Sequence, residues 1–115
     1  MKQTKKVKIK VEEEEYKILP LTFEGRGTQK DYVFTQLKRE GDLAIYEKHD
    51  AEIGKSYFET IVIKRHKGIQ IQQNWLEATE VYPSDNQFGV KGWCCLTLEI
   101  AEQRYQELKT QKHIK

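Results

Sequence analysis

Runs in which apolar and polar residues alternate occupy most of the first two thirds of the chain, and this pattern predicts β-strands. The clearest runs are 32–39, 43–48 and 57–64, and less regular ones cover 16–23 and 68–81. The third run is apolar at both odd and even positions, as expected for a central strand that is covered on both faces. Four to five strands are therefore expected in one antiparallel sheet.

Glycine and proline mark the connections between these runs. Gly41 falls at the first central position of a two-residue connection, where it suits a type II′ hairpin turn. Residues 24–31 contain two glycines but lack the Gly-Lys-Ser/Thr sequence and the following helix of a phosphate loop, so we expect a hairpin loop. Pro20 cannot donate to a β-ladder, which makes 16–23 an edge strand or a strand broken at the proline.

Near Thr97 the pattern changes to that of a single amphipathic helix. Thr97 is a suitable N-cap, and Glu99 lies in the first turn, where the helix dipole favours an acidic residue. A helix of about twelve residues would lay its apolar stripe on the sheet. Residues 111–115 are expected to fray. The apolar stripe consists of Leu98, Ala101, Tyr105 and Leu108.

The predicted fold class is therefore α+β, an antiparallel sheet of four to five strands with one C-terminal amphipathic helix packed on it. The other face of the sheet must be shielded in part by the long loop before the helix or by a partner. At 115 residues the chain can bury one core, and we expect a single domain over 16–110. Residues 1–15 are expected to form an edge strand or a flexible N-terminal arm, because lysines alternate with Val7, Ile9 and Val11.

Composition and charge limit the partners. The net charge of +2 implies no committed polyanion partner by itself. No apolar run approaches the roughly 18–20 residues that span a bilayer, and no apolar block follows the basic N-terminus as in a signal peptide. These features predict a soluble, cytoplasmic protein without a membrane partner, and they leave its oligomeric state open.

The sequence contains no motif of a known catalytic or metal site. It has neither a phosphate loop nor a Gly-x-Ser-x-Gly turn. Cys94 and Cys95 are too close for an internal disulfide, and in a strand one would point into the core and the other outward. The residues His49, His66 and His113 supply no ligand pair at zinc spacing. We expect no enzymatic activity, no cofactor and no metal, with a thiol enzyme or redox protein as the least favoured alternative.

The stretch from Tyr82 to Trp93 is the most distinctive in the sequence, since a dozen positions include one proline, two glycines and three aromatic residues. Residues 83–86 favour a turn, and the glycines permit tight backbone geometry. We expect Phe88 and Trp93 to fill the space between sheet and helix. A structural role is therefore favoured for most of this stretch.

Four groups of residues carry a resemblance to a known family. They are Phe23, Gly25 and Gly27; Phe34-Thr35-Gln36; Ala44-Ile45-Tyr46-Glu47; and Tyr82-Pro83-Ser84, Phe88-Gly89, Gly92-Trp93, Leu98-Glu99 and Ala101. From about Leu21 to Leu108 the chain resembles small uncharacterised proteins of bacteriophages, prophages and Bacteroidetes-type genomes. The resemblance implies no assigned activity, and it favours a mobile-element protein that acts by binding.

We therefore expect a small non-enzymatic protein that binds a host or phage protein, for example as an inhibitor or adaptor of a host complex. The alternative is a nucleic-acid-binding module, because residues 64–67 form the densest basic cluster outside the N-terminus. Trp75 is expected to be core or semi-buried cover, although tryptophan can also serve at an interface. The positions of the stretch 82–93 that are expected to be exposed are further candidates for contact. The candidates for partner contact are Lys64, Arg65, Lys67, Trp75, Tyr82, Asp85 and Lys91.

Overall fold

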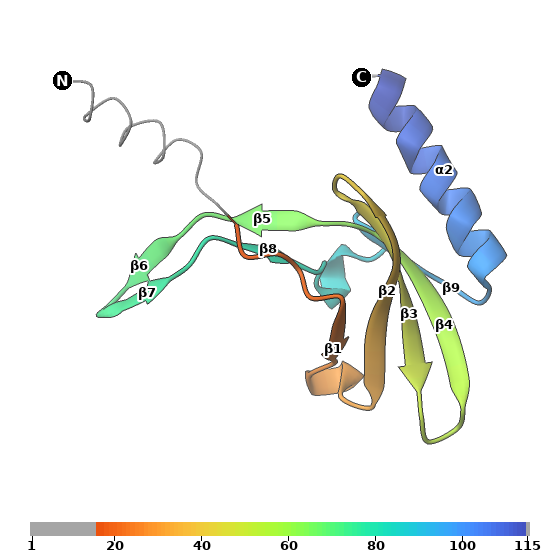
Figure 1. The fold of residues 1–115 in the computed structure, drawn as a ribbon, viewed down its shortest axis with the longest axis horizontal. Coiled ribbons are helices and arrows are strands. Elements are labelled where there is room, and N and C mark those ends of the chain that lie inside the picture. The colour runs from red at the N-terminus through yellow and green to blue at the C-terminus, as the bar shows by residue number, and fades with distance from the viewer. Residues whose placement is uncertain (1–15, 115) are drawn as a thin grey trace. The chain divides into compact units, whose positions relative to one another are not determined.

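The computed structural model of the chain describes residues 16–114. The edge strand or arm predicted for residues 1–15 lies outside the described residues. Within them, short and long β-strands are followed by one α-helix, in the order shown in Figure 1.

The described chain divides into two compact units. Residues 16–19 and Arg65–Val81 form the smaller unit, and Pro20–Lys64 with residues 82–114 form the larger one. The sequence analysis predicted a single domain over 16–110, whereas the structure separates the 65–81 segment from the sheet and helix.

The larger unit contains a five-stranded sheet with the order β1-β2-β3-β4-β9, in which all neighbours are antiparallel. Helix α2 (Leu98–Ile114) packs on one face of this sheet (Figure 1). The predicted fold class, an α+β fold with an antiparallel sheet and one C-terminal helix, is confirmed. The strands are β1 (Thr22–Glu24), β2 (Tyr32–Glu40), β3 (Leu43–Asp50), β4 (Lys55–Val62) and β9 (Gly92–Cys95).

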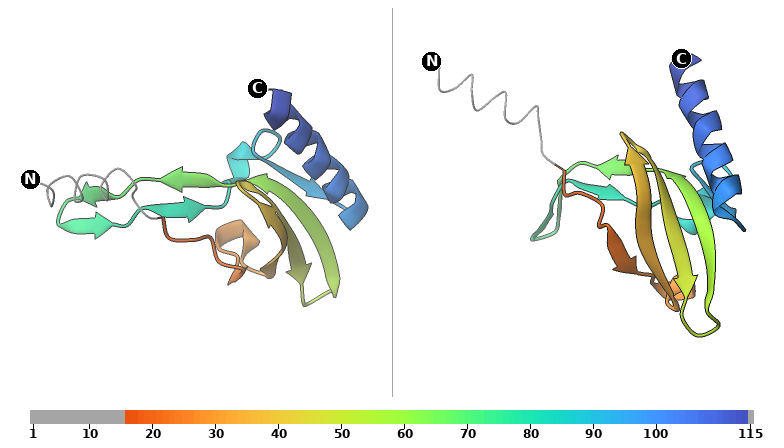
Figure 2. Two further views of the ribbon diagram at one scale, coloured as in Figure 1. Left: turned by 45° about the horizontal axis from the view of Figure 1, so that its top comes forward. Right: turned by 45° about the vertical axis from the view of Figure 1, so that its right-hand side comes forward.

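Local sequence features explain the turn and the bend between β2 and β3. Gly41 has a φ of +59° and Asp42 has an ordinary negative φ, which fits the predicted type II′ turn. The pairing register shifts between Gln36 and Lys38, so Leu37 forms a β-bulge. A bulge bends its strand and reverses the alternation of side chains, which puts Gln36 and Lys38 on opposite faces. Figure 2 shows β2, β3 and β4 bending together.

The face of the sheet under α2 carries a hydrophobic core. The predicted helix stripe is confirmed at Ala101, Tyr105 and Leu108, whereas Leu98 is 40% exposed. Thr60 adds a polar contact, since its Oγ1 donates to the carbonyl of Ala101 at 2.7 Å. The core residues are Leu43, Ile45, Cys95, Ala101 and Tyr105, with Phe58, Val62, Trp93 and Leu108 packed against them.

Helix α2 starts where the sequence predicts but extends further. The Oγ1 of Thr97 accepts a hydrogen bond from the backbone N–H of Ile100 at 3.2 Å, and Glu99 lies in the first turn. The helix spans 17 residues, whereas the apolar stripe predicted about twelve. The helix thus includes residues 111–114, which belong to the tail that was predicted to fray.

Polar contacts with β2 continue beyond the apolar stripe of the helix. Tyr105 donates from its hydroxyl to Glu40 at 2.9 Å, and the Nζ of Lys109 lies 3.1 Å from the same carboxylate. The hydrogen bonds from Lys109 and Tyr105 lower the pKa of Glu40. A further ion pair joins Lys38 to Glu102 at 3.0 Å. These partners come from a distant strand, so the contacts could not be predicted from the periodicity of the helix.

The sequence predicted a strand, the fourth of the sheet, over residues 68–81. This segment lies in the smaller unit. Two hydrogen-bonded strand pairs replace it, β6 with β7 and β5 with β8. The chain reverses after Ile71 through Gln72, which has a φ of +55°. This turn divides the predicted strand into a hairpin. The strands are β5 (Lys64–His66), β6 (Ile69–Ile71), β7 (Asn74–Leu76) and β8 (Thr79–Val81).

The predicted strand at 16–23 is broken at Pro20, one of its two predicted forms. Before the proline, Lys17 forms a bridge with Thr79 in the smaller unit. After it, β1 joins the five-stranded sheet of the larger unit. Because proline has no N–H, it suits the point at which the chain leaves one ladder for the other.

The face of the sheet opposite α2 is partly covered by the loop between Tyr82 and β9, which is one of the two coverings predicted. Within the loop, a short 3-10 helix, η2 (Asp85–Gln87), is closed by a capping box in which the side chain of Gln87 accepts from the N–H of Ser84. The ring of Phe88 lies over Gly92, where a Cβ atom would approach it to 3.0 Å. A larger residue at position 92 would require the ring of Phe88 to shift by a few tenths of an ångström.

The positions of the two predicted filling residues differ. Trp93 packs on the helix side, where the guanidinium of Arg104 lies 5.0 Å from its ring centre. Phe88 was predicted there too, but it contacts Gly92 and lines the opposite face. Side chains alternate along β9, and Phe88 precedes this strand in a loop that crosses the other face.

We expect Thr60→Val to lower the free energy of unfolding by about 1 kcal/mol, because it removes a buried hydrogen bond while conserving volume. Chemical denaturation monitored by circular dichroism measures this change. Thr110→Val is the matched control, since the Thr110 hydroxyl also donates to a helix carbonyl but is exposed. An equal loss in the two variants would contradict the importance assigned to the buried contact.

Candidate functional site

An aromatic cluster lies on the face of the sheet opposite α2. Phe23 and Phe34 stack with ring centres 4.9 Å apart and an interplanar angle of 5°. Tyr82 meets both rings and Tyr46 edge-on, at centre distances between 5.2 and 5.5 Å. Edge-to-face and stacked contacts of this kind add about 0.5–1.5 kcal/mol per pair beyond burial. The cluster therefore fixes Tyr82 against β1, β2 and β3.

The hydroxyl of Tyr82 reaches a buried carboxylate in the centre of the sheet. Glu59, on β4, is only 3% exposed, and its Oε1 accepts from Tyr82 at 2.7 Å. Its Oε2 lies 3.5 Å from the Nζ of Lys48 on β3, so an opposite charge accompanies the buried carboxylate. Burial first, and then the charge of Glu59, raise the pKa of Tyr82 well above its usual value. Tyr82 is therefore a neutral donor at physiological pH.

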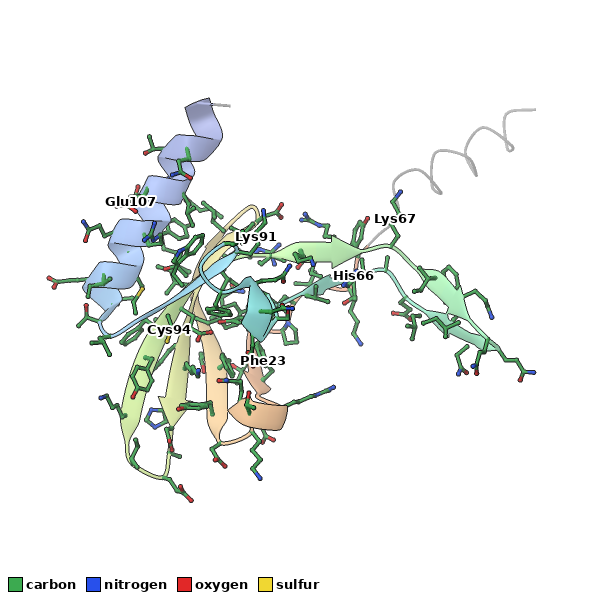
Figure 3. All side chains as sticks on the ribbon, turned by 180° about the vertical axis from the view of Figure 1, so that it is seen from behind. Phe23, His66, Lys67, Lys91, Cys94 and Glu107 are labelled. Carbon is green, nitrogen blue, oxygen red and sulfur yellow. The ribbon has the colours of Figure 1, made fainter. Side chains whose placement is uncertain are left out.

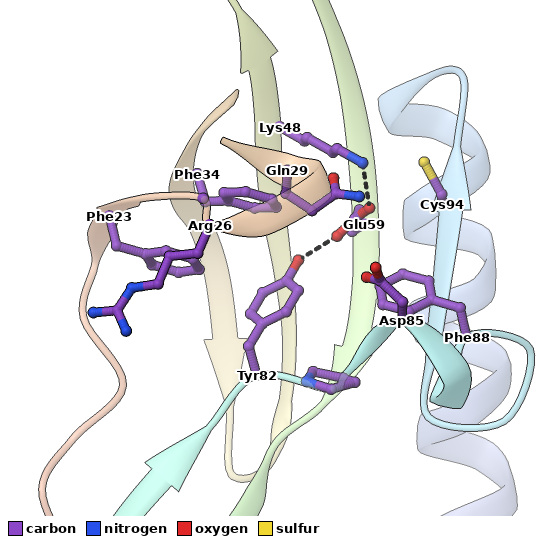
Figure 4. Close-up of a pocket in the computed structure, with 12 residues that line it drawn as sticks. Phe23, Arg26, Gln29, Phe34, Lys48, Glu59, Tyr82, Asp85, Phe88 and Cys94 are labelled. Carbon is purple, nitrogen blue, oxygen red and sulfur yellow. Dashed lines mark hydrogen bonds and ion pairs between the residues drawn. The ribbon is translucent and has the colours of Figure 1, made fainter. Parts of the chain in front are cut away.

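These side chains surround a cavity of about 320 Å³ in the larger unit (Figure 4). Figure 4 shows Tyr82 pointing toward Glu59, with Cys94 and Phe88 on the other side of the cavity. The remaining lining comes from the loop before β9 and from the loop after β1, which contains the 3-10 helix η1 (Gly27–Gln29). The lining residues are Phe23, Gly25, Arg26, Gln29, Phe34, Lys48, Glu59, Tyr82, Pro83, Asp85, Phe88 and Cys94.

The loops on the two sides of the cavity are joined by one hydrogen bond. The Oγ1 of Thr28 donates to Asp85 at 3.1 Å. Gly25 permits the tight path of the first loop, because a Cβ atom there would lie 2.0 Å from the carbonyl oxygen of Gln29. The Oε1 of Gln29 is buried and has no hydrogen-bond partner among the described residues. Gln29 lines the cavity, but this oxygen atom is not accessible from it.

The two cysteines alternate as predicted, with Cys95 buried and Cys94 exposed. Figure 3 shows Cys94 on β9 and Phe23 on β1. Desolvation first, and then the Glu59 carboxylate, raise the pKa of the Cys94 thiol to about 11. The thiol is therefore protonated at neutral pH, whereas nucleophilic cysteines have lowered pKa values.

A second candidate surface lies on the β6–β7 hairpin of the smaller unit. All six residues of its two strands are exposed. Ile69 pairs with Leu76, and Ile71 pairs with Asn74, so the apolar residues Ile69, Ile71 and Leu76 share one face. Trp75 lies on the other face. The exposed fractions are 49% for Ile69, 46% for Ile71, 58% for Trp75 and 49% for Leu76.

The basic candidates Lys64 and Arg65 lie on β5, the strand before this hairpin, and Lys67 lies between β5 and β6. Arg65 lies 3.3 Å from Glu80, and its guanidinium is 5.7 Å from the ring centre of Tyr16. Lys64 is half-buried, whereas Lys67 is exposed after β5 (Figure 3). The cluster therefore presents less free positive charge than its sequence indicates.

The other predicted contact residues have different environments. Trp75 was predicted to be core or cover, but more than half of its surface is exposed, on a strand whose three residues are all exposed. Tyr82 was expected to be exposed, but its ring packs in the aromatic cluster. Asp85 is exposed and accepts from Thr28, and Lys91 is exposed.

Of the residues that line the cavity, only Tyr82 and Asp85 were among the predicted contact residues. Lys48, Glu59 and Gln29 are among those that the sequence analysis did not single out. Glu59 had a usable signal, since it is an acid within an apolar strand that was predicted to be covered on both faces. Lys48 and Gln29 had none, because their positions depend on strand pairing and loop closure.

Comparisons with protein-family models, with curated proteins and with solved structures find no match for this chain. Within residues 16–114, no helix has the length and apolar character needed to cross a membrane. The same residues contain no group of three or more His, Cys, Asp or Glu side chains that could hold a metal ion.

The pH dependence of Cys94 alkylation should have its midpoint near 11, and Glu59→Gln should lower it, because the carboxylate contributes to the raised pKa. Iodoacetamide labelling with tandem mass spectrometry distinguishes Cys94 from Cys95. A pKa raised from 9.0 also means that this group's contribution to stability is present below pH 9 and is lost as the pH rises toward 11. Glu52→Gln, in the exposed β3–β4 turn, is the control. A midpoint near 9 in the folded protein would contradict the proposed environment.

Proposed function

We propose that this protein acts by binding another protein and that the β6–β7 hairpin is its contact surface. The observation that carries the proposal is the exposure of Ile69, Ile71, Trp75 and Leu76 on a hairpin with no buried residue. Monomeric proteins rarely expose apolar residues together in this way unless the surface has a partner. Tryptophan is also enriched among the residues that dominate binding energies.

The polarity of the hairpin supports the same function. Residues 68–76 contain no charged side chain, although a third of the whole chain is charged. Protein interfaces are depleted of charge at their centre and carry charge at the rim. Lys67 and Glu77 flank the segment and suit such a rim.

The backbone of the hairpin also favours a binding role. Gln72 has a φ of +55° at a turn position that usually takes glycine. A positive φ at a non-glycine residue costs on the order of 1 kcal/mol. Neither this turn nor a buried core stabilises the hairpin, so its sequence is better explained by contact with a partner.

A nucleic-acid-binding function is less well supported. Arg65 already interacts with Glu80 and Tyr16, and phosphate contacts need available positive charge. The resemblance to phage and prophage proteins favours an inhibitor or adaptor of a host complex, and we include that role in the proposal.

The proposal is tested with a photo-crosslinking amino acid at position 75, in the full chain expressed in its native host. We expect a discrete protein adduct, identified by mass spectrometry and then reconstituted from purified components. The matched control carries the same amino acid at Ile53, which is 66% exposed in the β3–β4 turn. Equal labelling at both positions, or nucleic acid as the only adduct, would contradict the proposal.

With the purified partner, Trp75→Ser should weaken binding by at least tenfold, because a central tryptophan contributes about 2 kcal/mol or more. Ile53→Ser should leave the dissociation constant unchanged. Calorimetry measures both, and circular dichroism checks that each variant is folded. Unchanged binding by a folded Trp75→Ser variant would exclude the hairpin as the contact surface.

A further inference from the structure

The β6–β7 hairpin carries exposed apolar side chains on both of its faces. Ile69, Ile71 and Leu76 lie on one face. Trp75 lies on the other face, opposite Gln70. All six residues of the two strands are exposed. An antiparallel sheet commonly packs one face on a core and turns a polar face to water. This ribbon has neither a packed face nor a fully polar one.

Either face alone is small for a protein interface. Each strand has three residues. At about 3.3 Å per residue, and with two strands roughly 4.8 Å apart, one face has a footprint of about 100 Å². Stable interfaces bury about 800 Å² on each partner. A partner that contacts both faces therefore gains about twice the area that a flat partner could reach through the same residues.

The distribution of charge allows the hairpin to be enclosed. None of residues 68–76 is charged, whereas Lys67 and Glu77 stand at the two ends of this segment. Because Ile69 pairs with Leu76, both charges lie at the base of the hairpin, and the turn lies at its other end (Figure 1). A charge is costly to bury without a partner charge. The uncharged ribbon can thus enter an apolar space while the two charges remain in water at the rim.

From this geometry we propose that the hairpin inserts into an uncharged, apolar cleft of its partner protein, whose two walls contact both faces of the ribbon. The inference rests on the proposed function, because it takes the hairpin as the contact surface and adds the shape and chemistry of the partner. One wall packs on Ile69, Ile71 and Leu76, and the opposite wall packs on Trp75. Lys67 and Glu77 remain at the rim.

Photo-crosslinking from both faces tests the insertion. Full-length chains carry p-benzoylphenylalanine in place of Ile71 or Trp75, which lie on opposite faces, and are expressed in the native host. We expect both positions to form an adduct with the same protein, at two different segments of its sequence identified by peptide mass spectrometry. The control position is Ile53, which is 66% exposed in the β3–β4 turn.

The pattern of adducts separates the two proposals. An adduct from only one of the two hairpin positions would overturn the insertion and leave the hairpin as a contact surface. Labelling no stronger than at the control position, from both hairpin positions, would contradict the proposed function as well. Adducts only with a second copy of this chain, or only with lipid, would also overturn the insertion.

A buried charge gives a second test with the purified partner. Asn74→Asp adds a charge to the hairpin with almost no change in size, and it should weaken binding at least about tenfold if the ribbon is enclosed. Asn86→Asp adds the same charge at an exposed position of the larger unit and should leave the dissociation constant unchanged. Calorimetry measures both variants, and circular dichroism checks their folding. Unchanged binding by Asn74→Asp, with weakened binding by Trp75→Ser, would overturn the cleft but retain the hairpin as the contact surface.

Discussion

The buried carboxylate of Glu59 is the constraint on which one whole face of the larger unit depends. A charge removed from water in the middle of a sheet is costly unless opposite charge and hydrogen-bond donors accompany it. Lys48 supplies the charge from the neighbouring strand, and Tyr82 supplies the donor from a loop 23 positions later in the chain. The loop before β9 must therefore cross this face, and the aromatic cluster fixes the one residue that makes the crossing bond.

The β-bulge at Leu37 makes this arrangement compatible with a helix on the opposite face. Before the bulge, Phe34 packs with the aromatic cluster. After it, Lys38 faces α2 and pairs with Glu102. The even-numbered positions of this strand thus face the aromatic cluster before the bulge and α2 after it. The sheet bends at the bulge, because the extra residue makes β2 locally longer than its partner strand β3.

Patterns confined to one element predicted their structures well. The N-cap at Thr97, the turn at Gly41 and the alternating exposure of Cys94 and Cys95 each depend on local geometry, and each is confirmed. Features that depend on distant partners were missed.

The failures at Phe88 and Trp75 show the limit of such reasoning. An aromatic residue near a helix is usually core, but the face on which Phe88 lies depends on the path of a loop. Trp75 was judged by its hydrophobicity, whereas its exposure follows from a turn at Gln72, a residue with little turn preference. In the distinctive stretch that starts at Tyr82, Trp93 packs under the helix as predicted, whereas Phe88 lies on the other face. Tyr82 was predicted to be exposed but packs in the aromatic cluster.

The hairpin and the cavity differ in exposure, charge and shape, and we therefore treat them as separate candidate sites. The hairpin has exposed apolar side chains and no charged residue. The interaction that it can offer is therefore the burial of apolar surface against a protein. The cavity is lined by aromatic side chains and by the ion pair of Glu59 and Lys48, and its volume of about 320 Å³ is in the range of small-molecule sites. Neither set of features serves the other purpose: a flat apolar ribbon cannot enclose a ligand, and a polar pocket contributes little area to an interface. Their location in different units of the chain lets each be altered without the other.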